Sequence, residues 1–303
     1  MLVKNKEFNN IKIHTQYSIC EGAIKIDELA NYCKANKIKA IGLADSYNLC
    51  GALEFAEKIS KVGTQPIIGT QINLLSDNQI GKITLYATSE QGYKNLTKLS
   101  SLSYLKNKNA HDPCCEIDDL ILNNEDLILL TGNYNNFFGK LFYANKTKYF
   151  EKIIKKLKSS FKDRLYIEIQ RHEESQESNY ENYLFKISSL YELPLIAGQE
   201  VYYLDSGMAE AHDALICIGE KQFIENQSRF RYSKEHYLKK KKKIKKLFID
   251  LPEALENNYN FPLRFNFKPK KSKPILPSVS IEESSSVEDI LKNQAYKGLE
   301  ERL

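Results

Sequence analysis

Short apolar runs alternate with amphipathic segments along most of this chain. In the clearest example, the apolar residues 41–44 end at Asp45, and Leu49, Leu53 and Phe55 follow at helical spacing. This pattern predicts a buried strand, a loop and a helix, with Asp45 at the end of the strand, where reactive side chains of α/β proteins collect. Repeated strand–helix units in 303 residues predict a parallel sheet closed into a barrel. An open doubly wound sheet is the competing architecture.

The same patterns predict the order of the elements. Strands are expected at residues 8–14, 38–43, 66–72, 82–87, 126–131, 165–169 and 193–197, and helices at 24–36, 49–60, 90–102, 136–143, 146–160, 178–191 and 208–218. Residues 76–78 (Ser-Asp-Asn) predict a turn. The polar segment 106–115 contains a proline and predicts a loop.

The C-terminal part differs in composition. Residues 265–277 carry Pro269, Pro274 and Pro277 among lysines, and residues 278–286 are rich in serine, so 265–286 is predicted to be a linker. Residues 287–303 return to helical spacing. We therefore expect one domain over residues 1–264 and the truncated start of another at 287–303.

Composition excludes several classes of protein. The chain is 42% hydrophobic and 27% charged, which is ordinary for a globular protein. No apolar run approaches the roughly 20 residues of a membrane helix, and the N-terminus lacks a signal-peptide core. The six cysteines form no CxxC pair, so neither a disulfide framework nor a structural zinc site is indicated. We expect a cytoplasmic protein with no membrane contact.

A lysine-rich run occupies residues 239–246 and contributes to the net charge of +5. Such a run can form a patch that binds nucleic acid. No aromatic or glycine residues interleave the lysines, however, as they often do in nucleic-acid-binding segments. A solvated helix face leading into Leu247 and Phe248 is therefore the favoured interpretation.

Several stretches of the sequence resemble one family. Residues 11–18 (IKIHTQYS), 21–23 (EGA), 45–55 (DSYNLCGALEF) and 66–69 (PIIG) resemble the polymerase-and-histidinol-phosphatase (PHP) domain. Residues 90–96 (EQGYKNL), 209–213 (AEAHD), 250–254 (DLPEA) and 295–302 (AYKGLEER) are similar to the N-terminal PHP domain of the bacterial DNA polymerase III alpha subunit. The resemblance implies a distorted TIM-like (β/α)7 PHP barrel, followed by a linker and the first helix of the polymerase region.

Metal-binding members of the family carry a cluster of His, Asp, Glu and Cys ligands at the barrel mouth. The resemblance places these ligand positions at Lys12, His14, Glu21, Ser46, Gln71, Lys82, Asn133, Glu200 and Tyr202. Of these positions, only His14 carries the same residue as the metal-binding members, and Glu21 and Glu200 keep an acidic side chain where those members have one. A protonated lysine has no lone pair for a metal and repels a divalent cation. The resemblance therefore implies a vestigial site that holds no metal, and no catalytic residue in this segment.

The two lysines suggest what replaced the metals. Carboxylates gathered at a barrel mouth repel one another and are costly to desolvate. We expect Lys12 and Lys82 to supply the positive charge that metals supply in other members. His14 is then expected to hydrogen-bond a carboxylate such as Asp45 rather than to bind a metal.

Other polar residues of the predicted mouth have two interpretations each. His172 is either a remnant of the pocket or an ordinary polar loop residue, which is the safer account. Asp45 is either a base or part of the helix-capping turn that follows it. The Tyr202–Tyr203 pair is expected to fill the mouth rather than to stack on a nucleotide.

Three functions remain open at this stage. The first is a scaffold that docks the separate proofreading 3′–5′ exonuclease subunit during DNA replication, as the resemblance implies. The second is a residual metal-dependent phosphoesterase or exonuclease, and the third is DNA binding through residues 239–246. The number of lost ligands favours the first function over the second.

Polymerase chemistry itself is not expected in this segment. Two-metal phosphoryl transfer needs carboxylates held close together, commonly as Asp-x-Asp, and the sequence contains no Asp-x-Asp. The resemblance implies that the full-length parent is a DNA-directed DNA polymerase that uses Mg²⁺. Its partners would be the exonuclease subunit, the remainder of the alpha subunit, the replisome and DNA.

Overall fold

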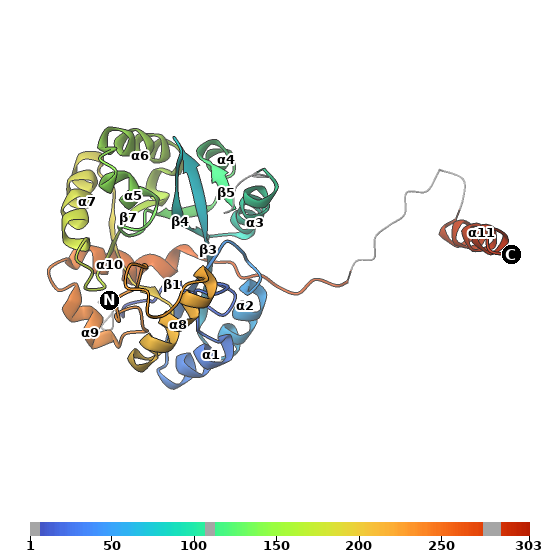
Figure 1. Cartoon of the computed structure of the whole chain (residues 1–303), viewed down its shortest axis with the longest axis horizontal. Coiled ribbons are helices and arrows are strands. Elements are labelled where there is room, and N and C mark those ends of the chain that lie inside the picture. The colour runs from blue at the N-terminus through green and yellow to red at the C-terminus, as the bar shows by residue number, and fades with distance from the viewer. Residues whose placement is uncertain (1–6, 107–112, 275–285) are drawn as a thin grey trace. The chain divides into compact units, whose positions relative to one another are not determined.

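The structure is a computed structural model that describes residues 7–106, 113–274 and 286–303. It contains two compact units, Met1–Lys270 and Lys271–Leu303. The first unit is an α/β barrel whose helices form an outer ring around the strands (Figure 1). In the second unit, helix α11 (Val287–Glu300) confirms the helix predicted there, and the Ser286 hydroxyl caps it by accepting from the Asp289 N–H.

One sheet forms the barrel. Its strands are β1 (Lys12–Ile13), β2 (Ala40–Ser46), β3 (Gln65–Ser76), β4 (Gln79–Ala87), β5 (Cys114–Glu116), β6 (Leu127–Leu130), β7 (Leu165–Gln170), β8 (Leu195–Gly198) and β9 (Glu200–Val201). Their order is β8-β7-β6-β4-β3-β2-β1-β9, with β5 paired to β3. Only Gln199 separates β8 from β9, so one continuous run of chain pairs with β7 and with β1. The nearly closed barrel is confirmed, and the open sheet is excluded.

The prediction of an all-parallel sheet is wrong at β4. This strand runs antiparallel to both of its neighbours, β3 and β6. The cause is the predicted turn, in which Asp77 and Asn78 both adopt positive φ angles of 48° and 57°. A two-residue loop of this type joins only antiparallel strands. The hairpin sets Lys82 opposite Asn73.

The predicted loop at 106–115 contains a strand at its end. β5 pairs in parallel with the outer part of β3, with Cys114 opposite Asn73. Cys114 and Cys115 are buried, so the pairing covers two small apolar side chains as well as backbone groups. Residues 107–112 of the predicted loop lie outside the described residues.

The helices of the first unit include all seven predicted ones in the predicted order, and two more, at residues 117–122 and 252–260, were not predicted. The helices are α1 (Ile26–Ala35), α2 (Ala52–Lys61), α3 (Glu90–Leu105), α4 (Ile117–Leu122), α5 (Phe137–Tyr143), α6 (Thr147–Phe161), α7 (Glu177–Tyr191), α8 (Ala209–Glu220), α9 (Lys241–Leu247) and α10 (Pro252–Asn260). Helix α2 shows why they pack, since Ala52, Phe55, Ala56 and Ile59 form one buried face at helical spacing. No helix in the described ranges is long and apolar enough to span a membrane.

The end of the barrel opposite the mouth is filled by aromatic side chains. Tyr86, from β4, contacts the rings of Phe261 and Phe265 edge-on, with centroids 5.5 Å and 6.3 Å away. Phe265 is buried, and the Gln65 side chain donates to its carbonyl oxygen. The segment predicted to begin the linker is therefore packed against the barrel at its start. The sequence pattern missed this because the prolines and lysines begin only after Phe267.

Candidate functional site at the barrel mouth

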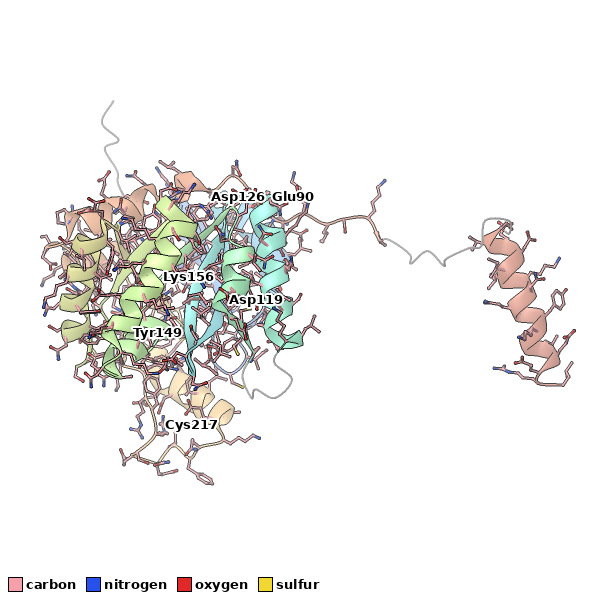
Figure 2. All side chains as sticks on the ribbon, turned by 90° about the horizontal axis from the view of Figure 1, so that it is seen from above. Glu90, Asp119, Asp126, Tyr149, Lys156 and Cys217 are labelled. Atoms are coloured by element: carbon pink, nitrogen blue, oxygen red, sulfur yellow. The ribbon has the colours of Figure 1, made fainter. Side chains whose placement is uncertain are left out.

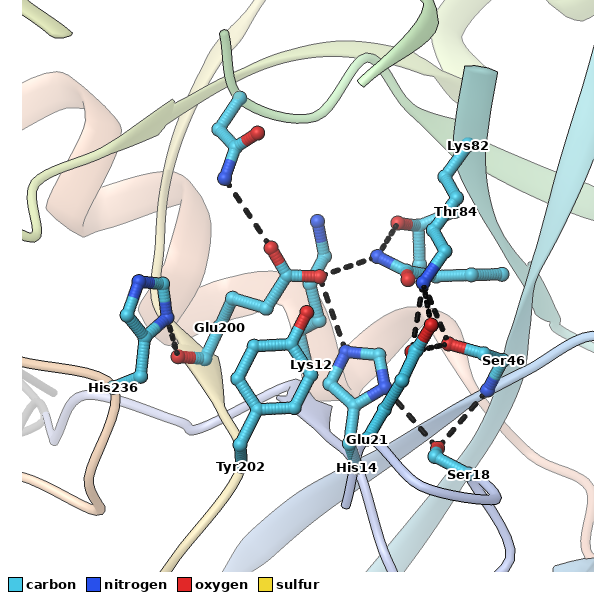
Figure 3. Close-up of polar contacts among 12 residues, drawn as sticks. Lys12, His14, Ser18, Glu21, Ser46, Lys82, Thr84, Glu200, Tyr202 and His236 are labelled. Atoms are coloured by element: carbon cyan, nitrogen blue, oxygen red, sulfur yellow. Dashed lines mark hydrogen bonds and ion pairs between the residues drawn. The ribbon is translucent and has the colours of Figure 1, made fainter. Parts of the chain in front are cut away.

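The predicted ligand positions converge at one end of the barrel (Figure 3). Strands β1, β2 and β9 contribute Lys12, Ser46 and Glu200, and the β3–β4 hairpin contributes Gln71 and Lys82. Figure 3 shows Lys12, Ser46, Lys82 and Glu200 pointing toward one another, together with His14, Glu21 and Tyr202. Parallel strands place their carboxyl ends at the same edge of a sheet, which is why residues far apart in sequence meet here.

The first ion pair lies deepest in the barrel. Lys12 Nζ lies 2.5 Å from Glu168 Oε2, and both side chains are fully buried. Glu168 Oε1 has no hydrogen-bond partner in the described part of the chain. Its carboxylate is packed against Gly198, where an added Cβ would lie 2.2 Å from Oε1. Glycine at this position therefore makes room for the ion pair.

The second ion pair lies nearer the surface. Lys82 Nζ lies 2.6 Å and 2.7 Å from the two carboxylate oxygens of Glu21, and the Ser46 hydroxyl donates to Glu21 Oε2. Burial alone would raise the pKa of Glu21, but the charge and hydrogen bonds of Lys82, together with His14 and the Ser46 hydroxyl, hold it below its usual value. Burial likewise opposes the charge of Lys82, and Glu21 keeps the pKa of this lysine above its usual value.

Glu200 is the centre of the polar network. Its Oε1 accepts from Gln71 Nε2 at 2.5 Å and contacts His14 Nε2 at 3.1 Å, while Oε2 accepts from Asn133 Nδ2 at 3.3 Å. Burial would raise the pKa of Glu200, but the charge of Lys12 and the hydrogen bond from His14 hold it well below the usual value. Both carboxylate oxygens are thus occupied by protein groups.

His14 has a carboxylate partner, as predicted, but the partner is Glu200 and not Asp45. Asp45 instead accepts three hydrogen bonds from the loop after β1: two from Thr15, through its N–H and its hydroxyl, and one from the Ser18 hydroxyl. The carboxylate is buried, and burial raises its pKa despite these hydrogen bonds. Asp45 therefore fixes the loop and does not face the other carboxylates.

His172 belongs to the mouth through the backbone of β9. Its Nε2 accepts from the Glu200 N–H, which leaves Nδ1 to donate to Glu177 Oε1 at 3.3 Å. Its ring stacks on His236 with centroids 4.0 Å apart, and His236 Nδ1 donates to the Glu200 carbonyl. Burial lowers the pKa of His172 to about 3 and that of His236 well below its usual value. The two histidines therefore fix the backbone of Glu200, one through its N–H and the other through its carbonyl oxygen.

An open cavity of about 360 Å³ lies above the network. Lys82 and Glu200 line it, together with Tyr47, Tyr202 and Tyr232. Tyr202 stacks on His14 with centroids 4.5 Å apart, and its hydroxyl lies 3.3 Å from that of Tyr232. Tyr202 thus forms part of the mouth wall, whereas Tyr203 is buried against His212.

Sequence reasoning missed three residues of the network, Glu168, Tyr232 and His236. Glu168 carried a signal, because it is the one acidic residue inside the apolar run 165–169. A charged residue is rarely buried in a strand unless an opposite charge pairs with it, so Glu168 indicated a buried basic partner. Tyr232 and His236 carried none, since they lie in an irregular segment that only the fold brings to the mouth.

The lysine-rich run is partly buried. Lys240, Lys242, Lys245 and Lys246 are exposed, as expected of a solvated face, and Ile244 and Phe248 are buried. The prediction is wrong for Lys239, whose side chain is buried over the ring of Tyr237 beside Glu235. Burial lowers the pKa of Lys239 to about 8.

Among residues 7–106, 113–274 and 286–303, no group of three or more His, Cys, Asp or Glu side chains is arranged to hold a metal ion. Glu21, Glu168 and Glu200 are each contacted by a lysine or by neutral donors. The mouth is therefore a network in which protein cations and amides meet the carboxylates.

Comparisons with known proteins identify the family of the barrel domain. Residues 10–172 match the PHP domain. The DNA polymerase III alpha subunit of Caulobacter vibrioides is 34% identical over 304 residues, which cover 98% of this chain and 27% of the relative. Those of Rickettsia conorii and Vibrio cholerae are 36% and 30% identical, covering 98% and 99% of this chain and 25% and 26% of the relatives.

The chain spans about a quarter of the length of these relatives. The PHP match covers more than half of the chain, from just before β1 to the end of the strand that carries Glu168. On this evidence, the chain belongs to the PHP domain family and is similar, over nearly its whole length, to DNA polymerase III alpha subunits.

Proposed function

We propose that this chain is a PHP domain of a replicative polymerase in which ion pairs replace the metal centre, and that it serves as a scaffold and docking platform. The observation that carries the proposal is the pairing of Lys12 with Glu168 and of Lys82 with Glu21. Lysine stands at two positions where metal-binding relatives carry ligands. Each of these lysines lies within 2.6 Å of a carboxylate oxygen.

The chemistry of the donor set does not fit a divalent metal. Two ammonium groups repel a cation, and they already neutralise Glu21 and Glu168. Ser46, Gln71 and Asn133 are neutral; Ser46 donates to Glu21, and Gln71 and Asn133 donate to Glu200. A cation entering the mouth would have to displace these contacts.

For the parent protein, we propose DNA-directed DNA polymerase activity with Mg²⁺, in DNA replication. Support comes from the alpha-subunit relatives, which are about four times as long as this chain. In this proposal the segment itself is catalytically inactive. Its partner is a proofreading 3′–5′ exonuclease subunit, which docks on the barrel. In the parent protein, the rest of the polymerase follows the barrel in the sequence.

Size-exclusion chromatography tests the docking role. The full chain and the exonuclease subunit of the same cell would be mixed at about 20 μM each and compared with each protein alone. We expect a 1:1 complex to elute ahead of both components. A second run replaces the chain with an unrelated basic protein of similar size, which should not shift the exonuclease. Separate elution of chain and exonuclease would remove the docking role and leave only the scaffold.

A residual phosphoesterase is the second candidate, because the cavity at the mouth is open and lined by both lysine and glutamate. Hydrolysis of a nitrophenyl nucleotide ester with added Mn²⁺ is the direct assay. We expect no activity above that of a Glu200→Gln control. Turnover that this substitution abolishes would favour the enzyme over the scaffold.

A further inference from the structure

Helix α6 carries a strongly basic outer face that the barrel mouth does not use. Its buried side consists of Phe150, Ile153, Ile154, Leu157 and Phe161. The opposite side is exposed and presents Lys148, Lys152 and Lys155 at spacings of four and three residues, followed by Lys162 just beyond the helix. We call these four lysines the α6 basic face. Figure 2 shows helix α6, marked by Tyr149 and Lys156, on the outside of the barrel next to α4, which carries Asp119.

These four lysines are not neutralised within the described residues. Of the neighbouring acids, Asp118 pairs with Lys156 and Asp163 with Arg264, while Glu151 accepts a hydrogen bond from the neutral Tyr191 hydroxyl and keeps its charge. Glu192, which is highly exposed, lies 3.9 Å from Lys158. None of the four lysines of the α6 basic face lies within 4 Å of a carboxylate of the described chain, by contrast with Lys156.

Two lysines of the α6 basic face are held over aromatic rings, and the face is long enough to contact several phosphates of a nucleic acid. Lys152 lies over the ring of Tyr149 and Lys155 over that of Tyr191, at 6.0 Å and 5.6 Å from the ring centroids. From Lys148 to Lys162 the face extends about 20 Å, at the usual rise of about 1.5 Å per residue. An open hollow of about 790 Å³ at its end is lined by four basic residues, Lys155, Lys158, Lys162 and Arg264, and by two acidic ones, Asp163 and Glu192.

We propose that the α6 basic face binds the phosphate backbone of duplex DNA without reading its sequence. Duplex DNA presents one negative charge per about 1.7 Å, so a face about 20 Å long meets many phosphates. The proposal does not depend on the docking role or on the fate of the metal site.

The alternatives fit this face less well. Insertion into a membrane needs an apolar side, and the apolar side of α6 is buried in the core of the barrel. A protein partner is expected to bind through aromatic or apolar anchors, and the outer side of α6 offers lysines and serines instead. Single-stranded DNA is bound by stacking on exposed aromatic rings, whereas Tyr149 and Tyr191 lie beneath lysines.

Fluorescence anisotropy with a labelled 30-base-pair duplex, titrated with the full chain between 50 and 200 mM salt, tests the proposal. Four phosphate contacts predict a slope of about −3.6 in a plot of log affinity against log salt, or roughly a 100-fold loss of affinity over this range. The variant K148Q/K152Q/K155Q/K162Q should lose nearly all of this slope. The control K240Q/K242Q/K245Q/K246Q removes four exposed lysines elsewhere and should keep it.

Several results would overturn the proposal. They are no binding at 50 mM salt, equal loss of slope in both variants, or loss in the control alone. Equally tight binding of vesicles containing 30% phosphatidylserine, lost in the same variant, would assign the face to membranes or to any polyanion. If the quadruple variant fails to fold by circular dichroism, K152Q/K155Q replaces it, with an expected loss of about half the slope.

Discussion

Lys12 and Glu168 form a fully buried ion pair, with Nζ and Oε2 2.5 Å apart, although 156 residues separate them in the sequence. A buried charge without its partner is strongly destabilising, while an ion pair replaced as a unit by apolar groups often costs nothing. Substitutions of this pair therefore test directly whether buried ion pairs stabilise the barrel mouth.

Lys12→Met should lower the free energy of unfolding by about 3–5 kcal/mol, because Glu168 is left buried and uncompensated. The double variant Lys12→Met/Glu168→Leu should recover most of this loss. Urea unfolding of the two variants measures both effects. Lys94→Met is the matched control, since it breaks an exposed pair with Glu90 and should cost less than about 1 kcal/mol. A loss of similar size in both single variants would contradict a buried pair.

Gly198→Ala should destabilise the protein through the same pair. The new Cβ would lie 2.2 Å from Glu168 Oε1, so the carboxylate must move away from Lys12. We expect a loss of about 1–3 kcal/mol, as in other overpacked sites. Gly298→Ala is the control, because no atom lies within 4 Å of its added Cβ and the position is inside helix α11. Thermal unfolding that shows no loss for Gly198→Ala would mean that Glu168 is not held against the glycine.

The stability of the protein should fall as the pH drops below about 6.5. His172 and His236 are neutral in the folded state because burial lowers their pKa values, whereas both take up protons in the unfolded chain near pH 6.5. The unfolded state then binds more protons, so acid favours unfolding. Each histidine contributes up to about 1.4 kcal/mol per pH unit.

His236→Gln isolates one of these contributions. Glutamine keeps an amide donor for the Glu200 carbonyl but does not titrate, so the pH dependence between pH 7 and pH 5 should become shallower by up to about 1.4 kcal/mol per unit. The comparison with the unmodified protein removes the opposing effect of buried acids such as Asp45, whose pKa is raised. Parallel pH profiles for the two proteins would show that the pKa of His236 does not differ between the folded and unfolded states, which would contradict its burial in the neutral form.

The barrel should extend past residue 264. Phe265 is buried against Tyr86 and Phe261, so a chain that ends at residue 264 loses a core aromatic side chain. We expect it to be less stable than a chain ending at residue 270 by about 3–5 kcal/mol, the usual cost of removing a buried phenylalanine. Equal urea midpoints for the two chains would place Phe265 outside the core.

The repeated strand–helix pattern predicted the barrel well because burial decides both the strands and the helices that cover them. The unit from Ile41 to Phe55 is an example, with a fully buried strand and an amphipathic helix. The antiparallel direction of β4 could also have been predicted, since only residues 73–81 separate the two predicted strands and a parallel crossover needs about a dozen residues or more. The short strand β5 could not, because its three residues gain their order from pairing with β3.

The candidate site was predictable in its positions and less so in its pairings. The resemblance identified Lys12, Lys82, Glu21 and Glu200 as neighbours at the mouth. It did not identify the partner of Lys12, because Glu168 is not one of the ligand positions. His14 was expected to hydrogen-bond a carboxylate such as Asp45, but Thr15 and Ser18 occupy that carboxylate and His14 contacts Glu200 instead. Such pairings depend on ångström-scale placement, which the pattern of residue types does not specify.

The metal content of the purified chain tests the central claim most directly. The protein would be equilibrated with Zn²⁺ or Mn²⁺, freed of unbound metal by gel filtration and measured by elemental analysis, with thermal unfolding recorded with and without EDTA. Because Lys12 and Lys82 take the place of cations, we expect far less than one metal ion per chain and an unchanged unfolding temperature. One or more ions retained per chain, together with a lower unfolding temperature in EDTA, would contradict the account.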